Sequence, residues 1–211
     1  MPTKEEIYEK QRIGLRRIGF GRKPAVIVID MQHDFIDEEG PSTCSPMGKM
    51  IIPPIRRLLE KARAKKVPVF YTQGVVHPSL VDVGLWKVQA HLEGKSQVEG
   101  TRGAEIIPEL APTSLDFVIK KRRPSAFFKT DLEVFLNGAG VDTLILTGLS
   151  MSGCVRATAT DAFMRDYRTM IVKECVGDRV QEVLDYNLFD LNAKYCDVVS
   201  LEETLTYLDS L

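Results

Sequence analysis

The most informative stretch of the chain is Val141-Asp-Thr-Leu-Ile-Leu-Thr-Gly-Leu-Ser-Met-Ser-Gly-Cys154-Val-Arg-Ala-Thr158. Its apolar run from Leu144 to Leu146 predicts a buried strand, and Gly148 to Gly153 predicts a short turn. Apolar residues then recur at helical spacing, so a helix is expected to begin at the cysteine. The N–H groups and positive dipole end of such a helix favour a thiolate, which makes Cys154 a candidate nucleophile. A small, inert, buried apolar residue is the alternative interpretation of this cysteine.

Six stretches have the composition of buried strands and alternate with helical patterns. They lie near residues 24–30, 67–73, 115–121, 142–148, 168–174 and 196–200. This alternation predicts an α/β fold of three layers, α/β/α, with a six-stranded, mostly parallel sheet. Two of the helices are well marked. An apolar face repeats between Met50 and Lys65, and Thr130 precedes the helical run Asp131–Leu136 as a cap.

Two of these strands end in charged residues. The continuous apolar run that starts at Ala25 ends at Asp30, and the run that starts at Leu115 ends at Lys120 and Lys121. Because the carboxyl ends of parallel strands meet at one edge of a sheet, where ligands bind, an acid, an amine and the Cys154 thiol are expected to meet there. Taken singly, Asp30 also fits a turn cap and Lys121 a solvated strand end.

Three blocks of the sequence resemble the signature blocks of the isochorismatase-like cysteine hydrolases. The blocks are Ala25-Val-Ile-Val-Ile-Asp30-Met-Gln-His-Asp-Phe35, Lys121-Arg-Arg-Pro-Ser-Ala-Phe127-Phe-Lys-Thr130 and Ser152-Gly-Cys154-Val-Arg-Ala-Thr158. The resemblance extends from about Gly14 to the C-terminus. It implies a three-layer, Rossmann-like fold and a hydrolase that works without a cofactor.

The resemblance also implies roles for individual residues. Cys154 would be the nucleophile, Asp30 the base that takes its proton, and Lys121 a cation between them that stabilises both charges. The oxyanion would be bound by the backbone N–H groups of Ser150 and Cys154. A cis peptide bond is expected between Leu149 and Ser150, as in other members of this family.

Within the family, the chain is most similar to the N-carbamoylsarcosine amidohydrolases and then to the maleamate amidohydrolases. The resemblance therefore predicts attack on a small carboxylated amide or ureido compound, with cleavage of a C–N bond and release of ammonia. Arg179 matches an arginine that binds the substrate carboxylate, and guanidinium groups suit that task. An ion pair with Asp178 or a contact with a helix N-terminus is the alternative for Arg179. Hydrolysis of isochorismate, whose enzymes lack the cysteine, and a catalytically idle binding subunit are the alternatives for the whole chain.

The segment 74–103 is too long for a plain connection between two strands. It contains Trp86, and we expect the segment either to form a wall or lid of the substrate pocket or to be a surface loop held in place by a buried indole. Nicotinamidases of the same superfamily bind a metal through an Asp and two His after the second strand, where this chain has only His77. We therefore expect no catalytic metal.

The overall composition is that of an ordinary soluble protein. The 211 residues carry a net charge of −1 and suit one domain, which we place at 21–211. No nucleic-acid or membrane partner is expected, since no basic surface or apolar run of about 20 residues is present. Four scattered cysteines and a polar first segment predict a reduced, cytoplasmic protein. The charged arm at 1–20 is expected to contact another subunit in a homo-oligomer, a dimer or tetramer.

Overall fold

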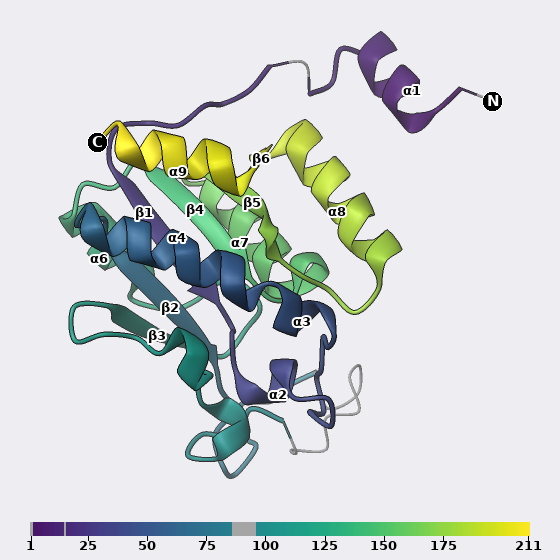
Figure 1. Ribbon diagram of the computed structural model, residues 1–211. Coiled ribbons are helices and arrows are strands. Elements are labelled where there is room, and N and C mark those ends of the chain that lie inside the picture. The colour runs from purple at the N-terminus through teal and green to yellow at the C-terminus, as the bar shows by residue number, and fades with distance from the viewer. Residues whose placement is uncertain (1, 15, 86–95) are drawn as a thin grey trace.

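A parallel six-stranded sheet forms the centre of the molecule (Figure 1). The computed structural model describes residues 2–14, 16–85 and 96–211. The sheet order is β3-β2-β1-β4-β5-β6, and each neighbouring pair of strands is parallel. The strands are β1 (Pro24–Ile29), β2 (Val69–Gly74), β3 (Phe117–Lys121), β4 (Thr143–Gly148), β5 (Arg168–Val176) and β6 (Asp197–Val199). The predicted α/β architecture is thus confirmed, with a sheet that is parallel throughout its six strands.

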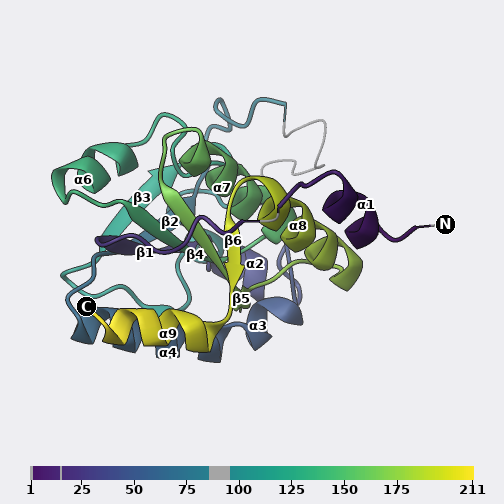
Figure 2. The same ribbon diagram turned by 90° about the horizontal axis from the view of Figure 1, so that it is seen from above.

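Helices cover both faces of this sheet, as the view from above shows (Figure 2). One face is covered by helices of the first and last parts of the chain, α2 (His33–Ile36), α3 (Met47–Met50), α4 (Ile52–Ala64) and α9 (Leu201–Asp209). The other face is covered by α6 (Leu132–Gly138), α7 (Arg156–Phe163) and α8 (Gln181–Lys194). Side chains of β1 alternate between the two cores, with Val26 and Val28 on the first face and Ile27 and Ile29 on the second. The central strands are therefore buried on both sides, which explains their nearly unbroken apolar sequences.

Two of the predicted helices differ in detail from expectation. The pattern between Met50 and Lys65 is divided at Ile51, so that α4 begins at Ile52 with prolines in its first turn. The helix after Thr130 begins at Leu132, and its cap residue Asp131 makes no side-chain cap hydrogen bond. The Thr130 hydroxyl accepts the Leu132 N–H at 3.4 Å, as its predicted capping role requires, and also donates to the Ala126 carbonyl at 2.5 Å. Thr130 therefore stabilises the turn before the helix.

The N-terminal arm contains α1 (Lys4–Lys10), none of whose residues is buried. The ring of Tyr8 packs edge-on against the ring of Phe189 in α8, with the ring centroids 4.9 Å apart. Further along, the N–H groups of Ile18 and Gly19 donate to the Asp197 carboxylate at 3.0 and 2.7 Å. In Figures 1 and 2 the arm runs outside the layered body, beside α8. The division at residue 20 and the contact with another subunit stay predictions.

Candidate active site

The carboxyl end of β1 places Asp30 at the centre of the site. Asp30 follows the strand directly and adopts a left-handed conformation with φ 49°, which turns the chain out of the sheet. Its N–H donates to Thr72 Oγ1 at 3.1 Å, and the Thr72 hydroxyl donates to Asp30 Oδ1 at 2.6 Å. Both residues are completely buried. Thr72 thus fixes both the backbone and the carboxylate of Asp30, a role that no sequence pattern indicated.

The carboxyl end of β3 brings Lys121 against this carboxylate. Lys121 Nζ lies 2.7 Å from Asp30 Oδ2 and also donates to the Arg123 carbonyl at 3.2 Å and to Cys154 Sγ at 3.3 Å. Burial by itself would lower the pKa of the ammonium, but Asp30 and Cys154 outweigh it and hold the pKa above its ordinary value. Lys121 therefore stays charged between the carboxylate and the sulfur.

The turn after β4 delivers the sulfur. Gly148 has φ 102°, and a Cβ on it would lie 2.0 Å from the Ile29 carbonyl oxygen, so only glycine allows β4 to approach β1 this closely. The Leu149–Ser150 peptide bond is cis, as expected from the family. Met151–Val155 then forms one wide π-helical turn before α7 begins at Arg156. Cys154 lies in this turn rather than at the start of a regular α-helix.

Asp178 holds the same turn from the end of β5. Its Oδ2 accepts the Ser152 N–H at 2.6 Å, and its Oδ1 accepts the Arg179 N–H at 2.8 Å. Its side chain is almost fully buried. The Met151 N–H also donates to the Gly177 carbonyl at 2.8 Å. The sequence indicated Asp178 only as an alternative partner of Arg179, whereas the structure makes it an organiser of the turn that carries the sulfur.

The expected thiolate is not favoured in this arrangement. Burial raises the pKa of the Cys154 thiol to about 12, the negative charge of Asp30 acts in the same direction, and Lys121 opposes both. The local sequence shows neither the burial of the sulfur nor the carboxylate beside it, and both act against the thiolate that the sequence predicts. A neutral thiol next to a carboxylate needs that carboxylate as its proton acceptor.

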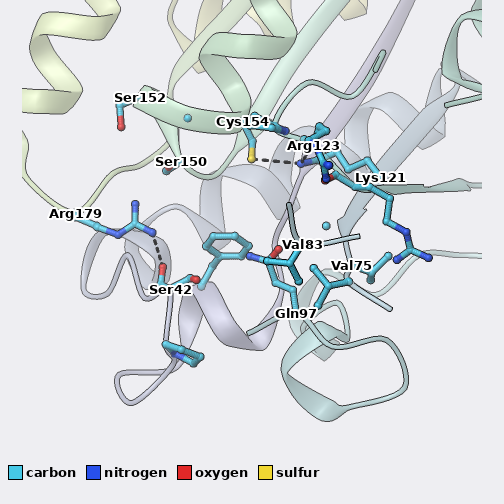
Figure 3. A pocket seen from close by; sticks show the side chains of 17 residues that line it. Ser42, Val75, Val83, Gln97, Lys121, Arg123, Ser150, Ser152, Cys154 and Arg179 are labelled. Carbon is cyan, nitrogen blue, oxygen red and sulfur yellow. Dashed lines mark hydrogen bonds between the residues drawn. The ribbon is translucent and has the colours of Figure 1, made fainter. Parts of the chain in front are cut away.

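A pocket of about 410 Å³ opens in front of the sulfur (Figure 3). Lys121, Ser150 and Cys154 line one side, and Arg179 and Ser42 lie together on another. Within the described ranges, the Ser150 N–H has no acceptor, so it is available to a bound oxyanion. The same part of the chain contains no group of three His, Cys, Asp or Glu side chains placed to hold a metal ion.

Arg179 lies at the pocket, and its guanidinium does not form the ion pair with Asp178 that was its alternative role. Its Nη2 donates to the Ser42 carbonyl at 2.7 Å, and Asp178 receives its backbone N–H instead. Its exposed guanidinium faces the pocket from the side opposite Lys121 (Figure 3). Trp86 lies in 86–95, outside the described residues. None of the helices within the described ranges has the length and apolar character needed to cross a bilayer.

Comparisons with known proteins identify the family and the fold. The N-carbamoylsarcosine amidase of Arthrobacter sp is 41% identical over 201 residues, which cover 93% of this chain and 75% of the relative. The maleamate amidohydrolase of Pseudomonas putida is 38% identical over 197 residues, which cover 93% and 92%. A crystal structure of a cysteine hydrolase from Pseudomonas syringae superposes with a TM-score of 0.85 at 26% identity and covers 89% and 93% of the two chains. The isochorismatase domain model matches residues 24–203, and the chain belongs to this family.

Proposed function

We propose that the protein is a cysteine-dependent amidohydrolase that cleaves the C–N bond of a small carboxylated amide or ureido compound and releases ammonia. The cluster of Asp30, Lys121 and Cys154 at the wall of one pocket carries this proposal, because it supplies a nucleophile, a base and a cation within contact distance. We assign no cofactor to the reaction. All four cysteines are free thiols, which supports a cytoplasmic location.

The first half of the reaction is acylation of the thiol. Cys154 Sγ attacks the carbonyl carbon while its proton passes to the Asp30 carboxylate, and Lys121 stabilises the negative charge in transit. The oxyanion accepts hydrogen bonds from the Ser150 and Cys154 N–H groups. Asp30 then returns the proton to the leaving nitrogen, the C–N bond breaks, and ammonia departs.

The second half is deacylation by water. A water molecule gives a proton to Asp30 and attacks the carbonyl carbon of the thioester-like intermediate. The C–S bond breaks, the acid product leaves, and the proton returns to Cys154 Sγ. The balance is one amide and one water converted into one acid and one ammonia, and the triad ends in its starting state.

Arg179 is the residue that we assign to substrate selection. Its guanidinium donates to the Ser42 carbonyl and faces the pocket that contains Cys154. The remaining N–H groups of this guanidinium can therefore bind a substrate carboxylate inside the pocket. N-Carbamoylsarcosine is the first candidate, supported by the similarity to the Arthrobacter amidase and by the stretches Arg16–Gly21 and Gly84–Trp86. Maleamate is the second, supported by the Pseudomonas relative and by Cys175–Arg179. Trp86 stays a candidate for the pocket wall.

The test is ammonia release from N-carbamoylsarcosine, maleamate, nicotinamide and ureidoacrylate by wild type, Cys154→Ala and the matched control Cys175→Ala. Cys175 is a buried thiol outside the pocket. We expect turnover of one carboxylated substrate, lost by at least about 10³-fold in Cys154→Ala and retained in Cys175→Ala. Ammonia release by Cys154→Ala at the wild-type rate would refute the cysteine mechanism. If wild type released no ammonia from any of the four substrates, the result would favour the alternative of a binding subunit without catalytic activity.

A further inference from the structure

A small space beside Gly74, at the end of β2, is surrounded by oxygen acceptors. A Cβ on Gly74 would lie 3.1 Å from Gln97 Oε1, 3.5 Å from Gln32 Oε1 and 3.7 Å from Asp30 Oδ2. Gly74 and Gln97 both line the pocket that contains Cys154. The missing side chain of Gly74 therefore leaves room, next to the catalytic carboxylate, for a group that donates hydrogen bonds.

Two of these three oxygens are available to such a donor. Gln32 Oε1 already accepts the Gly74 N–H at 2.8 Å, and its Nε2 donates to the Gly74 and Ala104 carbonyls, so this amide serves the backbone. Asp30 Oδ2 is buried against Lys121 Nζ at 2.7 Å, and a carboxylate oxygen can accept one further hydrogen bond, for which the described residues supply no donor. The Gln97 carboxamide likewise has no partner in that part of the chain.

The backbone of Gln97 is firmly held although it belongs to a long connection. Its N–H donates to Asp34 Oδ2 at 2.5 Å, and its carbonyl accepts the Val76 N–H at 2.9 Å. It adopts a left-handed conformation with φ 57°, and Asp34 is buried. Figure 3 shows Gln97 on the side of the pocket that faces Cys154 and Lys121. Its carboxamide is thus presented to the pocket from a fixed point.

We infer that Gln97 Oε1 and Asp30 Oδ2 together bind the primary amino group that leaves as ammonia. One N–H of the substrate –NH₂ donates to Asp30 Oδ2, the atom that later returns the proton, and the other donates to Gln97 Oε1. This inference rests on the proposed function and narrows it to primary amides and terminal ureido groups. An N-alkyl group would replace one donor and leave Gln97 Oε1 without a hydrogen bond, and sites built to bind an N–H discriminate strongly on this ground.

The test compares each substrate with its N-methyl analogue, for example maleamate with N-methylmaleamate, by measuring kcat/KM for release of ammonia and of methylamine. Gln97→Met removes the acceptor at similar size, and Gln97→Glu keeps an acceptor in place. Gln73→Met is the matched control, since Gln73 donates to the Ala104 carbonyl at 2.6 Å and does not line the pocket. Thermal unfolding verifies that each variant is folded.

We expect wild type to prefer the primary amide strongly, and Gln97→Met to reduce that preference by about tenfold or more. Gln73→Met should keep most of that preference, whereas Gln97→Glu should lower the hydrolysis rate, because it places a second carboxylate near Asp30. An unchanged preference in Gln97→Met, with the primary amide still hydrolysed, would overturn the inference and leave the proposed function standing. Ammonia release that survives in Cys154→Ala would instead remove the proposed function, and the inference with it.

Discussion

Lys120 and Lys121 are neighbours on β3 and both form ion pairs, yet the two pairs lie in different surroundings. Lys121 pairs with Asp30 at 2.7 Å, and the two side chains are 2% and 1% exposed. Lys120 points to the opposite face and pairs with Glu99 at 2.5 Å, with exposures of 56% and 32%. Successive side chains of a strand alternate between its faces, so Lys121 points into the buried site while its neighbour Lys120 lies at the surface. We assign the buried pair to the proposed reaction, whereas the exposed pair fastens a loop to the edge of the sheet.

Lys120 belongs to a group of surface ion pairs that join the long connection before β3 to the end of that strand. We call this group the strap, and its members are Asp82, Glu99, Lys120 and Arg122. Arg122 contacts Asp82 at 3.1 Å and Glu99 at 3.0 Å, so both parts of the long connection are tied to β3. Exposed pairs of this kind contribute little stability each. A buried pair that loses one partner leaves an uncompensated charge, at a cost of about 3–5 kcal/mol. The following predictions test how far this difference extends.

The largest effects are expected from the two sides of the buried pair. Asp30→Asn and Lys121→Met should each reduce hydrolysis by at least about 10³-fold. Their effects on alkylation of Cys154 by iodoacetamide at pH 8 should be opposite, because Asp30 raises the pKa of the thiol and Lys121 lowers it. Asp30→Asn should therefore react faster than wild type, and Lys121→Met more slowly. The rate is followed by mass spectrometry of the modified cysteine.

Lys120→Met is the matched control for that experiment, since it removes a lysine from the same strand on the exposed face. Its alkylation rate and hydrolysis should equal those of wild type within about twofold. If Asp30→Asn and Lys121→Met both slowed alkylation, the two groups would not act on the thiol pKa as opposing charges, and Asp30 would act on the sulfur mainly as its proton acceptor.

The same contrast explains what the sequence predicts and what it does not. Asp30, Lys121 and Cys154 follow apolar runs at strand or turn boundaries, so a parallel sheet brings them together almost by its topology. Thr72 gives no such signal, because a buried threonine in a strand has the composition of any β-branched strand residue. Asp178 stands beside Arg179 and was considered only as its partner. Gln97 lies in a connection whose path depends on a distant anchor, Asp34. The sequence therefore predicts the reacting groups but not the residues that orient them.

The next largest effect is expected from Arg179, to which we assign the substrate carboxylate and which lies across the pocket from Lys121. Arg179→Lys replaces a planar fork by a single ammonium, so KM for the carboxylated substrate should rise about tenfold or more while kcat changes less. Arg57→Lys, a change of the same kind in a surface ion pair with Glu202 outside the pocket, should leave KM close to the wild-type value. Steady-state kinetics of both variants measure this. A fall in kcat with unchanged KM in Arg179→Lys would instead assign the arginine to the chemical step.

The smallest effect is expected from the strap itself and depends on pH. Hydrogen bonds from Lys120 and Arg122 lower the pKa of Glu99 from 4.5 to about 2. A depressed carboxyl pKa stabilises the fold above the ordinary value, and this contribution is lost as the pH falls from about 4.5 toward 2. Glu99→Gln should therefore lower Tm by at most a few degrees at pH 7, and this difference should shrink as the pH approaches 2, where the Glu99 carboxylate of wild type becomes protonated.

Thermal unfolding of wild type and Glu99→Gln between pH 7 and pH 2 measures this difference, with Glu60→Gln, an exposed glutamate of α4, as the matched control. Salt at about 0.5 M should reduce the difference at pH 7, because screening weakens exposed pairs much more than buried ones. A Tm difference that persists at low pH or in high salt would mean that Glu99 stabilises the loop by packing rather than by charge. The stabilisation by the Lys120–Glu99 pair would then not depend on its charges, and the contrast in screening between this exposed pair and the buried Lys121–Asp30 pair would be lost.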